Sequence, residues 1–86
     1  MRIVRAGDDY DIGQWTSWLQ IHGADINDVR SVDIHDNGKV VLHVYDQDVG
    51  GFRYVRDGEE EAALLPPVVI RNPLMPPPPF KERVRR

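Results

Sequence analysis

The chain lacks cysteine altogether over its 86 residues. This absence excludes disulfide bridges, thiolate zinc sites and thiol redox chemistry, and it fits a reducing cytoplasm. A chain of this length supports one domain, and so small a domain buries only about 60% of the surface that its unfolded chain exposes. We therefore expect the C-terminal segment, a second copy of the chain or a partner to supply part of the missing burial.

Long apolar runs are also lacking. Residues 1–5 contain two arginines with no apolar run behind them, so they do not have the pattern of a signal peptide. Residues 62–70 form one of the longest apolar stretches, but prolines interrupt it and it is far too short to span a bilayer. Neither segment predicts a contact with a membrane.

Proline is lacking from the first 65 residues, since all seven prolines lie between Pro66 and Pro79. The charge changes sign at the same point: residues 1–65 hold six Lys/Arg against thirteen Asp/Glu, and residues 66–86 hold five against one. The formal balances are −7 and +4, which together give the net charge of −3. A basic, proline-rich tail cannot build a core of its own, so we expect it to pack along the acidic body or to bind a partner.

Motifs for catalysis are lacking as well. No glycine-rich phosphate loop follows a strand pattern, and no Ser–His–Asp order indicates a nucleophile. Asp46-Gln47-Asp48 has the carboxylate spacing with which some sugar-nucleotide enzymes hold a metal ion, but those enzymes need a nucleotide-binding domain far larger than this chain. We therefore expect a protein that is not an enzyme and that holds no cofactor.

Two groups of potential metal ligands have a simpler interpretation. Residues 33–38 superficially resemble a calcium loop with a glycine sixth, but the third position is His35 and the twelfth, where such a loop needs a bidentate glutamate, is Val44. His35 and His43 share one face of a predicted hairpin but lie four ladder positions apart, which is too far for one zinc ion. We expect a hairpin turn with exposed histidines here, and no metal site.

Turning to what is present, the clearest local pattern is a helix over residues 12–22. Asp11 is a plausible N-cap with Gln14 three residues later, the arrangement of a capping box. Gly23 is placed to end the helix in a left-handed conformation. The buried stripe of this helix is expected to contain Ile12, Trp15, Leu19 and His22.

Trp18 lies beside this stripe and leaves two interpretations open. In the first interpretation it packs in the core with Trp15, which is the common outcome for tryptophan in a small domain. Alternatively it is half exposed and forms a contact patch with Ile21, because tryptophan and tyrosine are enriched at protein interfaces.

The next pattern is a hairpin formed by residues 31–35 and 39–45 around Asp36-Asn37-Gly38. A three-residue loop with Gly38 in the left-handed position pairs residues 34 with 40 and 32 with 42. A two-residue loop would mix charge into both faces, and since one buried face fixes the register, the three-residue loop is favoured. The buried face then contains Val32, Ile34, Val40, Leu42 and Val44.

The remaining segments complete an α+β fold. Residues 3–4 are expected as a short first strand, residues 24–30 as a loop and residues 52–56 as a strand that returns antiparallel. Residues 59–65 form either a short helix with acids in its first turn or part of an edge strand over residues 62–70, where prolines are tolerated. We predict one N-terminal helix on a three- to four-stranded antiparallel sheet in a domain of residues 1–72, and an extended tail of residues 73–86.

The tail itself allows several interpretations. Residues 76–81 contain the pattern Pro-x-x-Pro-x-Lys, which aromatic grooves bind in a polyproline conformation. We favour either a stiff spacer or a segment laid along the body with Phe80 as its anchor. Residues 73–86 are the part of the tail that we expect to be free to reach a partner. The terminal cations could contact phosphates, although the acidic body makes nucleic acid an unlikely partner.

A longer series of residues gives a resemblance. It consists of Trp15-x-x-Trp18-Leu19-x-x-His22-Gly23-x-Asp25, then Asp28-Val29, the hairpin with Asp36-Asn37-Gly38, and a Val68-Val69 strand with prolines around it. Over residues 12–72 this order resembles small uncharacterised proteins of actinobacteria and their phages. The resemblance implies a phage or mobile-element origin and brings no activity with it.

Together these patterns predict a non-enzymatic protein–protein interaction module, an accessory protein that acts on a host or virion protein in the bacterial cytoplasm. One alternative is a structural or assembly component of the virion whose tail wraps a neighbouring subunit, and another is a small nucleic-acid-binding regulator. A homo-oligomer is compatible with the interaction module and with the virion component. The residues expected at the partner surface are Trp18, Ile21, Tyr45, Phe80, Lys81, Arg83, Arg85 and Arg86.

Overall fold

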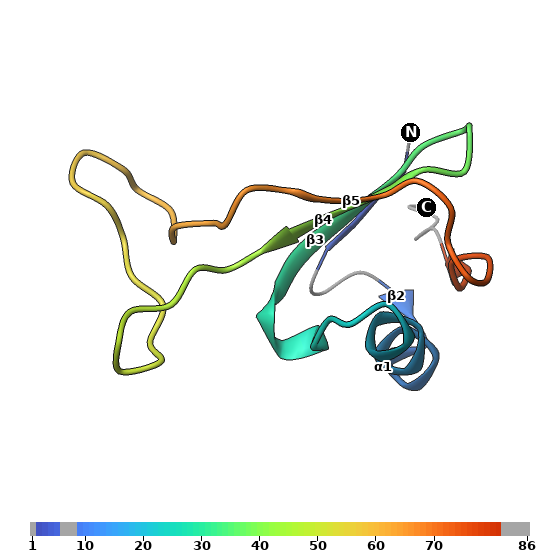
Figure 1. Cartoon of the computed structure of the whole chain (residues 1–86), viewed down its shortest axis with the longest axis horizontal. Coiled ribbons are helices and arrows are strands. Elements are labelled where there is room, and N and C mark those ends of the chain that lie inside the picture. The colour runs from blue at the N-terminus through green and yellow to red at the C-terminus, as the bar shows by residue number, and fades with distance from the viewer. Residues whose placement is uncertain (1, 6–8, 82–86) are drawn as a thin grey trace, which may run out of the picture.

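The body of the protein is a four-stranded antiparallel sheet with one helix, α1, against one of its faces (Figure 1). The structure, a computed structural model, describes residues 2–5 and 9–81. The sheet has the order β1-β3-β4-β5, with β1 at Arg2–Arg5, β3 at Val29–Ile34, β4 at Val40–Val44 and β5 at Val68–Ile70. The predicted α+β class, with one helix on an antiparallel sheet, is confirmed.

Helix α1 (Ile12–Ile21) begins and ends as its sequence predicts, to within one residue. The Asp11 side chain accepts a hydrogen bond of 3.0 Å from the backbone N–H of Gln14, which satisfies one of the free amides of the first turn. At the other end His22 is the C-cap, and Gly23 has a φ of 81°. The left-handed glycine lets the chain turn away from the helix without a steric clash.

The buried face of α1 is rotated from the predicted stripe. Trp15, Trp18 and Leu19 are each 2% exposed, whereas Ile12 is 65% exposed. Of the two interpretations of Trp18, burial in the core with Trp15 is confirmed and the half-exposed contact patch is wrong, and the burial expected for Ile12 is also wrong. The physical reason is that α1 is covered on two sides, by the sheet and by the chain that follows β5, and the second cover lies over Trp18.

The hairpin of β3 and β4 has the predicted register. Ile34 pairs with Val40 and Val32 with Leu42, and Gly38 has a φ of 88° in the three-residue loop. The five apolar residues of the predicted inner face are buried or half-buried in the core beneath α1. Alternation of side chains along two paired strands thus explains the larger part of this core.

The segment expected as a loop, residues 24–30, is more regular than predicted. A 3-10 helix, η1, covers Ile26–Asp28, and β3 already begins at Val29. The side chain of Asp25 accepts from the N–H of Asn27 at 2.9 Å, so an aspartate again starts the helical turn.

Residues 45–65, between β4 and β5, form an extension that we call the arm, and it projects beyond the end of the sheet (Figure 1). Three extended segments meet there around Ala63, whose N–H donates to the carbonyl of Tyr54 at 2.8 Å and whose carbonyl accepts from the N–H of Asp46 at 2.9 Å. Residues 52–56 therefore pair with the returning chain and not with β4, so the strand predicted there is wrong as a member of the main sheet. Ala63 is buried, and its small side chain allows the segments to approach each other.

The ambiguity over residues 59–65 is resolved in favour of the edge strand. Leu64 bridges Tyr45 in antiparallel fashion, and β5 continues the same edge beside β4 after the interruption at the two prolines. Residues 59–65 contain no helical turn. The prolines lie between the two paired stretches, where no amide is needed for the ladder.

Residues 71–81, which follow β5, form a strap over α1. At its end β6 (Phe80–Lys81) pairs with β2 (Asp9–Tyr10) in a separate two-stranded sheet. Residues 73–81 therefore lie along the body, as one of the two favoured interpretations of the tail predicts, and the expectation that they are free to reach a partner is wrong. Residues 82–86 lie outside the described part of the chain.

Over residues 2–5 and 9–81, none of the helices is long and apolar enough to cross a membrane.

Candidate interaction surfaces

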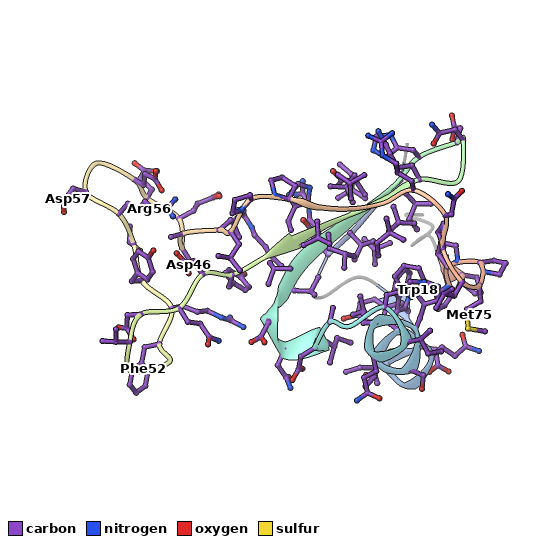
Figure 2. The ribbon with its side chains drawn as sticks, viewed as in Figure 1. Trp18, Asp46, Phe52, Arg56, Asp57 and Met75 are labelled. Carbon is purple, nitrogen blue, oxygen red and sulfur yellow. The ribbon has the colours of Figure 1, made fainter. Side chains whose placement is uncertain are left out.

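The outer part of the arm has two turns, one at Asp57-Gly58 and a closed one at residues 48–52, which we call the tip (Figure 2). The carboxylate of Asp48 accepts hydrogen bonds from the N–H groups of Gly50 and Phe52 at 2.9 and 3.0 Å. The backbone of Asp48 also donates to the carbonyl of Phe52 and accepts from Gly51, which has a φ of 81°. This turn directs Val49, which is fully exposed, and Phe52, which is 72% exposed, into solvent.

A polar network around Asp46 fixes the middle of the arm. The hydroxyl of Tyr54 donates to Oδ2 of Asp46, and the Arg56 guanidinium lies 3.6 Å from the same oxygen (Figure 2). The hydrogen bond from Tyr54, with a second from the N–H of Gln47, lowers the pKa of the Asp46 carboxyl below its ordinary value of 3.8. The same bond raises the pKa of Tyr54 above its ordinary value of 10.0, because the carboxylate favours the protonated phenol.

The base of the arm is attached to η1 by side chains. The Arg53 guanidinium lies 3.9 Å from the centroid of the Tyr45 ring and donates to the carbonyl of Asn27. The amide of Gln47 donates to the carboxylate of Asp28 at 3.1 Å. Since the tip, the middle and the base are each held by hydrogen bonds, the arm presents its apolar end in a defined conformation.

The arm also carries the negative charge of the molecule. Residues 45–65 hold two Arg against six Asp/Glu, a balance of −4, which leaves nine Lys/Arg against eight Asp/Glu, or +1, for the rest of the chain. Arg30 of β3 pairs with Glu61 near the base, but the charged side chains of the arm are largely exposed. An acidic projection with an apolar end is the result.

At the opposite end of the molecule the strap is bonded to α1. The indole N–H of Trp18 donates to the carbonyl of Met75 at 2.9 Å, and the backbone N–H of Leu74 donates to Nε2 of His22 at 3.0 Å. The rings of Trp18 and His22 are stacked, with centroids 4.0 Å apart and planes tilted by 31°. Trp18 is thus buried because the strap covers it.

A shallow groove of ≈ 630 Å³ runs between α1 and the strap. Ile21 of α1, Met75 and Pro76–Pro79 of the strap give it a mainly apolar lining, and Ile21 and Met75 are about half exposed. Figure 2 shows that Phe52 of the tip and Met75 of the groove lie at opposite ends of the molecule. Among the exposed apolar surfaces of the described residues, the tip therefore projects and the groove is hollowed.

The residues predicted for the partner surface do not form one site. Trp18 and Ile21 both line the groove, with Trp18 almost fully buried, whereas Tyr45 is half-buried at the base of the arm beneath Arg53. Phe80 and Lys81 belong to β6, where only their backbone pairing is described, and Arg83, Arg85 and Arg86 lie outside the described residues.

Sequence reasoning missed Val49 and Phe52, the two most exposed apolar residues of the tip. The sequence pattern places Phe52 in a strand over residues 52–56 and gives Val49 no role. A signal was present, because an apolar residue placed between Asp48 and two glycines has no strand or helix in which to be buried.

Among the described residues, His, Asp and Glu do not gather in threes as a metal site requires. One titratable pair lies on the sheet: Nε2 of His43 is 2.8 Å from Oδ2 of Asp33 on the neighbouring strand. The side chains of His43 and Asp33 are therefore hydrogen-bond partners of each other across two strands.

Comparison with known proteins adds no relative: neither a protein-family model, nor a curated protein, nor a solved structure matches this chain. The resemblance to small proteins of actinobacteria and their phages therefore stays a prediction.

Proposed function

We propose that the protein is a protein-binding module that contacts its partner with the tip of the arm. The observation that carries this proposal is the exposure of Val49 and Phe52 from a turn that Asp48 closes with hydrogen bonds. An exposed aromatic side chain held in a fixed position is typical of the anchors that dominate binding energy.

The structure of the arm favours binding in energetic terms. Each Å² of apolar surface removed from water contributes roughly 25 cal/mol, so the side chains of the tip gain by entering an apolar pocket. Loops usually lose conformational entropy when they bind, but the hydrogen-bonded turn and the Asp46 network have already ordered this one. The arm is preorganised for contact.

The charge of the arm indicates the chemistry of the partner. With a balance of −4, the arm is repelled by phosphates and attracted to an apolar pocket with a neutral or basic rim. A protein fits this description better than a nucleic acid does. Action on a host or virion protein, in the bacterial cytoplasm or in the virion, remains a prediction from the resemblance.

The second candidate, an assembly component whose tail wraps a neighbour, receives no support from residues 73–81. These residues are engaged with α1 and β2 of their own chain. The third, a nucleic-acid regulator, would depend on the terminal arginines, which lie outside the described part of the chain.

The test is site-specific photocrosslinking in a bacterial cell that makes the full chain. A photoreactive amino acid at Val49 should give a covalent adduct with a defined protein, and the added substitution Phe52→Ala should remove it. A probe at Ile12, which is also exposed but lies on α1, is the matched control. Equal adduct yields at the two positions would contradict a role for the tip.

A further inference from the structure

We infer that a partner of the tip is a second copy of this chain: the tip of one molecule enters the groove between α1 and the strap of the next. This inference rests on the proposed function, because it names the partner for the same surface. It gives the protein a head-to-tail mode of association.

The first argument is the placement of the two surfaces. The tip exposes Val49 and Phe52, and the groove half-exposes Ile21 and Met75. Phe52 and Met75 lie at opposite ends of the long axis (Figure 2), so one molecule cannot bring its own tip to its own groove. Two copies can make this contact with no change in either fold.

The second argument is charge. Two arms, each with a balance of −4, repel each other, which disfavours a symmetric contact of tip with tip. The rest of the chain carries +1, and α1, which forms one side of the groove, contains no charged residue over Ile12–Ile21. An acidic arm is therefore better placed against the groove of a second copy than against a second arm.

The third argument is shape and surface chemistry. A turn of five residues that projects two apolar side chains is convex, and the groove of ≈ 630 Å³ is concave and mainly apolar. Methionine adapts its shape to an incoming ring, and the prolines are rigid and lose little freedom when they are covered. Both surfaces are ordered before contact, the tip by Asp48 and the groove by the bonds of the strap to Trp18 and His22.

A contact of this kind joins different patches on the two molecules, so one molecule of a pair keeps an unused groove and the other keeps an unused tip. Such heterologous contacts produce closed rings or open chains, not simple two-fold dimers. The contact area of one turn in one groove is small, so we expect weak association that grows with protein concentration.

The test is sedimentation velocity of the full chain over a concentration series up to about 1 mM, the range in which weak contacts are populated. We expect a sedimentation coefficient that rises with concentration. Phe52→Ser in the tip and Ile21→Ser in the groove should each weaken association at least tenfold. The matched controls are Val55→Ser and Ile12→Ser, which remove exposed apolar side chains of the arm and of α1 outside the contact.

Mixing the two defective variants separates this geometry from a symmetric one. Phe52→Ser retains its groove and Ile21→Ser retains its tip, so an equimolar mixture should form a heterodimer that grows no further. A wild-type chain that stays monomeric up to about 1 mM, or an association that the two variants leave intact, would overturn the inference. If the wild type is monomeric while the probe at Val49 still captures another protein, the proposed function stands and only the identity of the partner falls.

Discussion

The strap can be tested with two tryptophans that are equally buried and differ in one hydrogen bond. Trp15 and Trp18 are both 2% exposed, and their rings meet edge to face with centroids 5.6 Å apart. The indole N–H of Trp18 donates to the Met75 carbonyl, whereas that of Trp15 finds no acceptor among the described residues. Replacement by phenylalanine removes a similar part of the ring system at each site.

The expected difference in stability follows from these contacts. Trp18→Phe loses a hydrogen bond that contributes about 1 kcal/mol to the free energy of unfolding. The cost is not larger because Met75 is half-exposed, so that water can take the place of the indole N–H at its carbonyl. Trp15→Phe removes a buried donor without a partner and so relieves a desolvation penalty of about 1 kcal/mol or more. The packing losses are similar, so Trp18→Phe should be the more destabilising change by about 2 kcal/mol.

Urea denaturation followed by far-UV circular dichroism measures this difference without relying on tryptophan fluorescence. With a slope of roughly 1 to 2 kcal/mol per molar urea for a small domain, the two midpoints should differ by about 1 to 2 M. Amide exchange at Leu74 gives a local readout, because Trp18→Phe loosens the strap and Trp15→Phe does not. Equal midpoints, or a lower midpoint for Trp15→Phe, would refute the reasoning.

Three further predictions concern the arm and the helix. Tyr54→Phe removes the hydrogen bond that lowers the pKa of Asp46, so the carboxyl pKa measured by NMR titration should rise toward 3.8. Because the folded-state pKa of the wild type lies below this value, the stabilisation from Asp46 is fully present above pH 3.8 and is lost as the pH falls through the folded-state pKa. An unchanged titration in the variant would contradict this prediction. Gly51→Ala places a side chain on a residue with a φ of 81°, so thermal melts should show a loss of about 1 kcal/mol in the free energy of unfolding. Hydrogen exchange at the Phe52 amide should become faster, and full retention of its protection would show that the turn does not depend on Gly51. Asp11→Ala removes the N-cap of α1 and should cost about 1 kcal/mol, whereas Asp11→Asn should retain most of it; equal losses in the two variants would exclude capping as the cause.

The parts of the fold that depend on neighbours in sequence could be predicted. The hairpin register follows from the alternation of residues 32–44 and from a glycine at the one position that needs a positive φ. The ends of α1 follow from Asp11 and Gly23, which act within one turn of the helix. In each case the deciding contact lies within a few residues.

The parts that failed depend on contacts between distant residues. Trp18 is buried by Met75, which lies 57 residues away, and no local pattern shows that the strap returns to α1. In the same way residues 52–56 pair around Ala63 because the chain comes back at that point, which strand propensity alone does not reveal. The candidate surfaces were missed for this reason: what remains exposed is known only after the strap and the arm are in place.

The bond between the strap and His22 has a consequence for the chemistry of the groove. A ring nitrogen that accepts from the Leu74 amide must present its lone pair, so the proton of the neutral imidazole sits on Nδ1, which lies 2.8 Å from the Trp18 carbonyl and donates to it. The ring is held as a single tautomer with both nitrogens occupied by backbone groups. A histidine stacked on a tryptophan has the appearance of a general base, yet here the Leu74 amide and the Trp18 carbonyl are the partners of its two ring nitrogens.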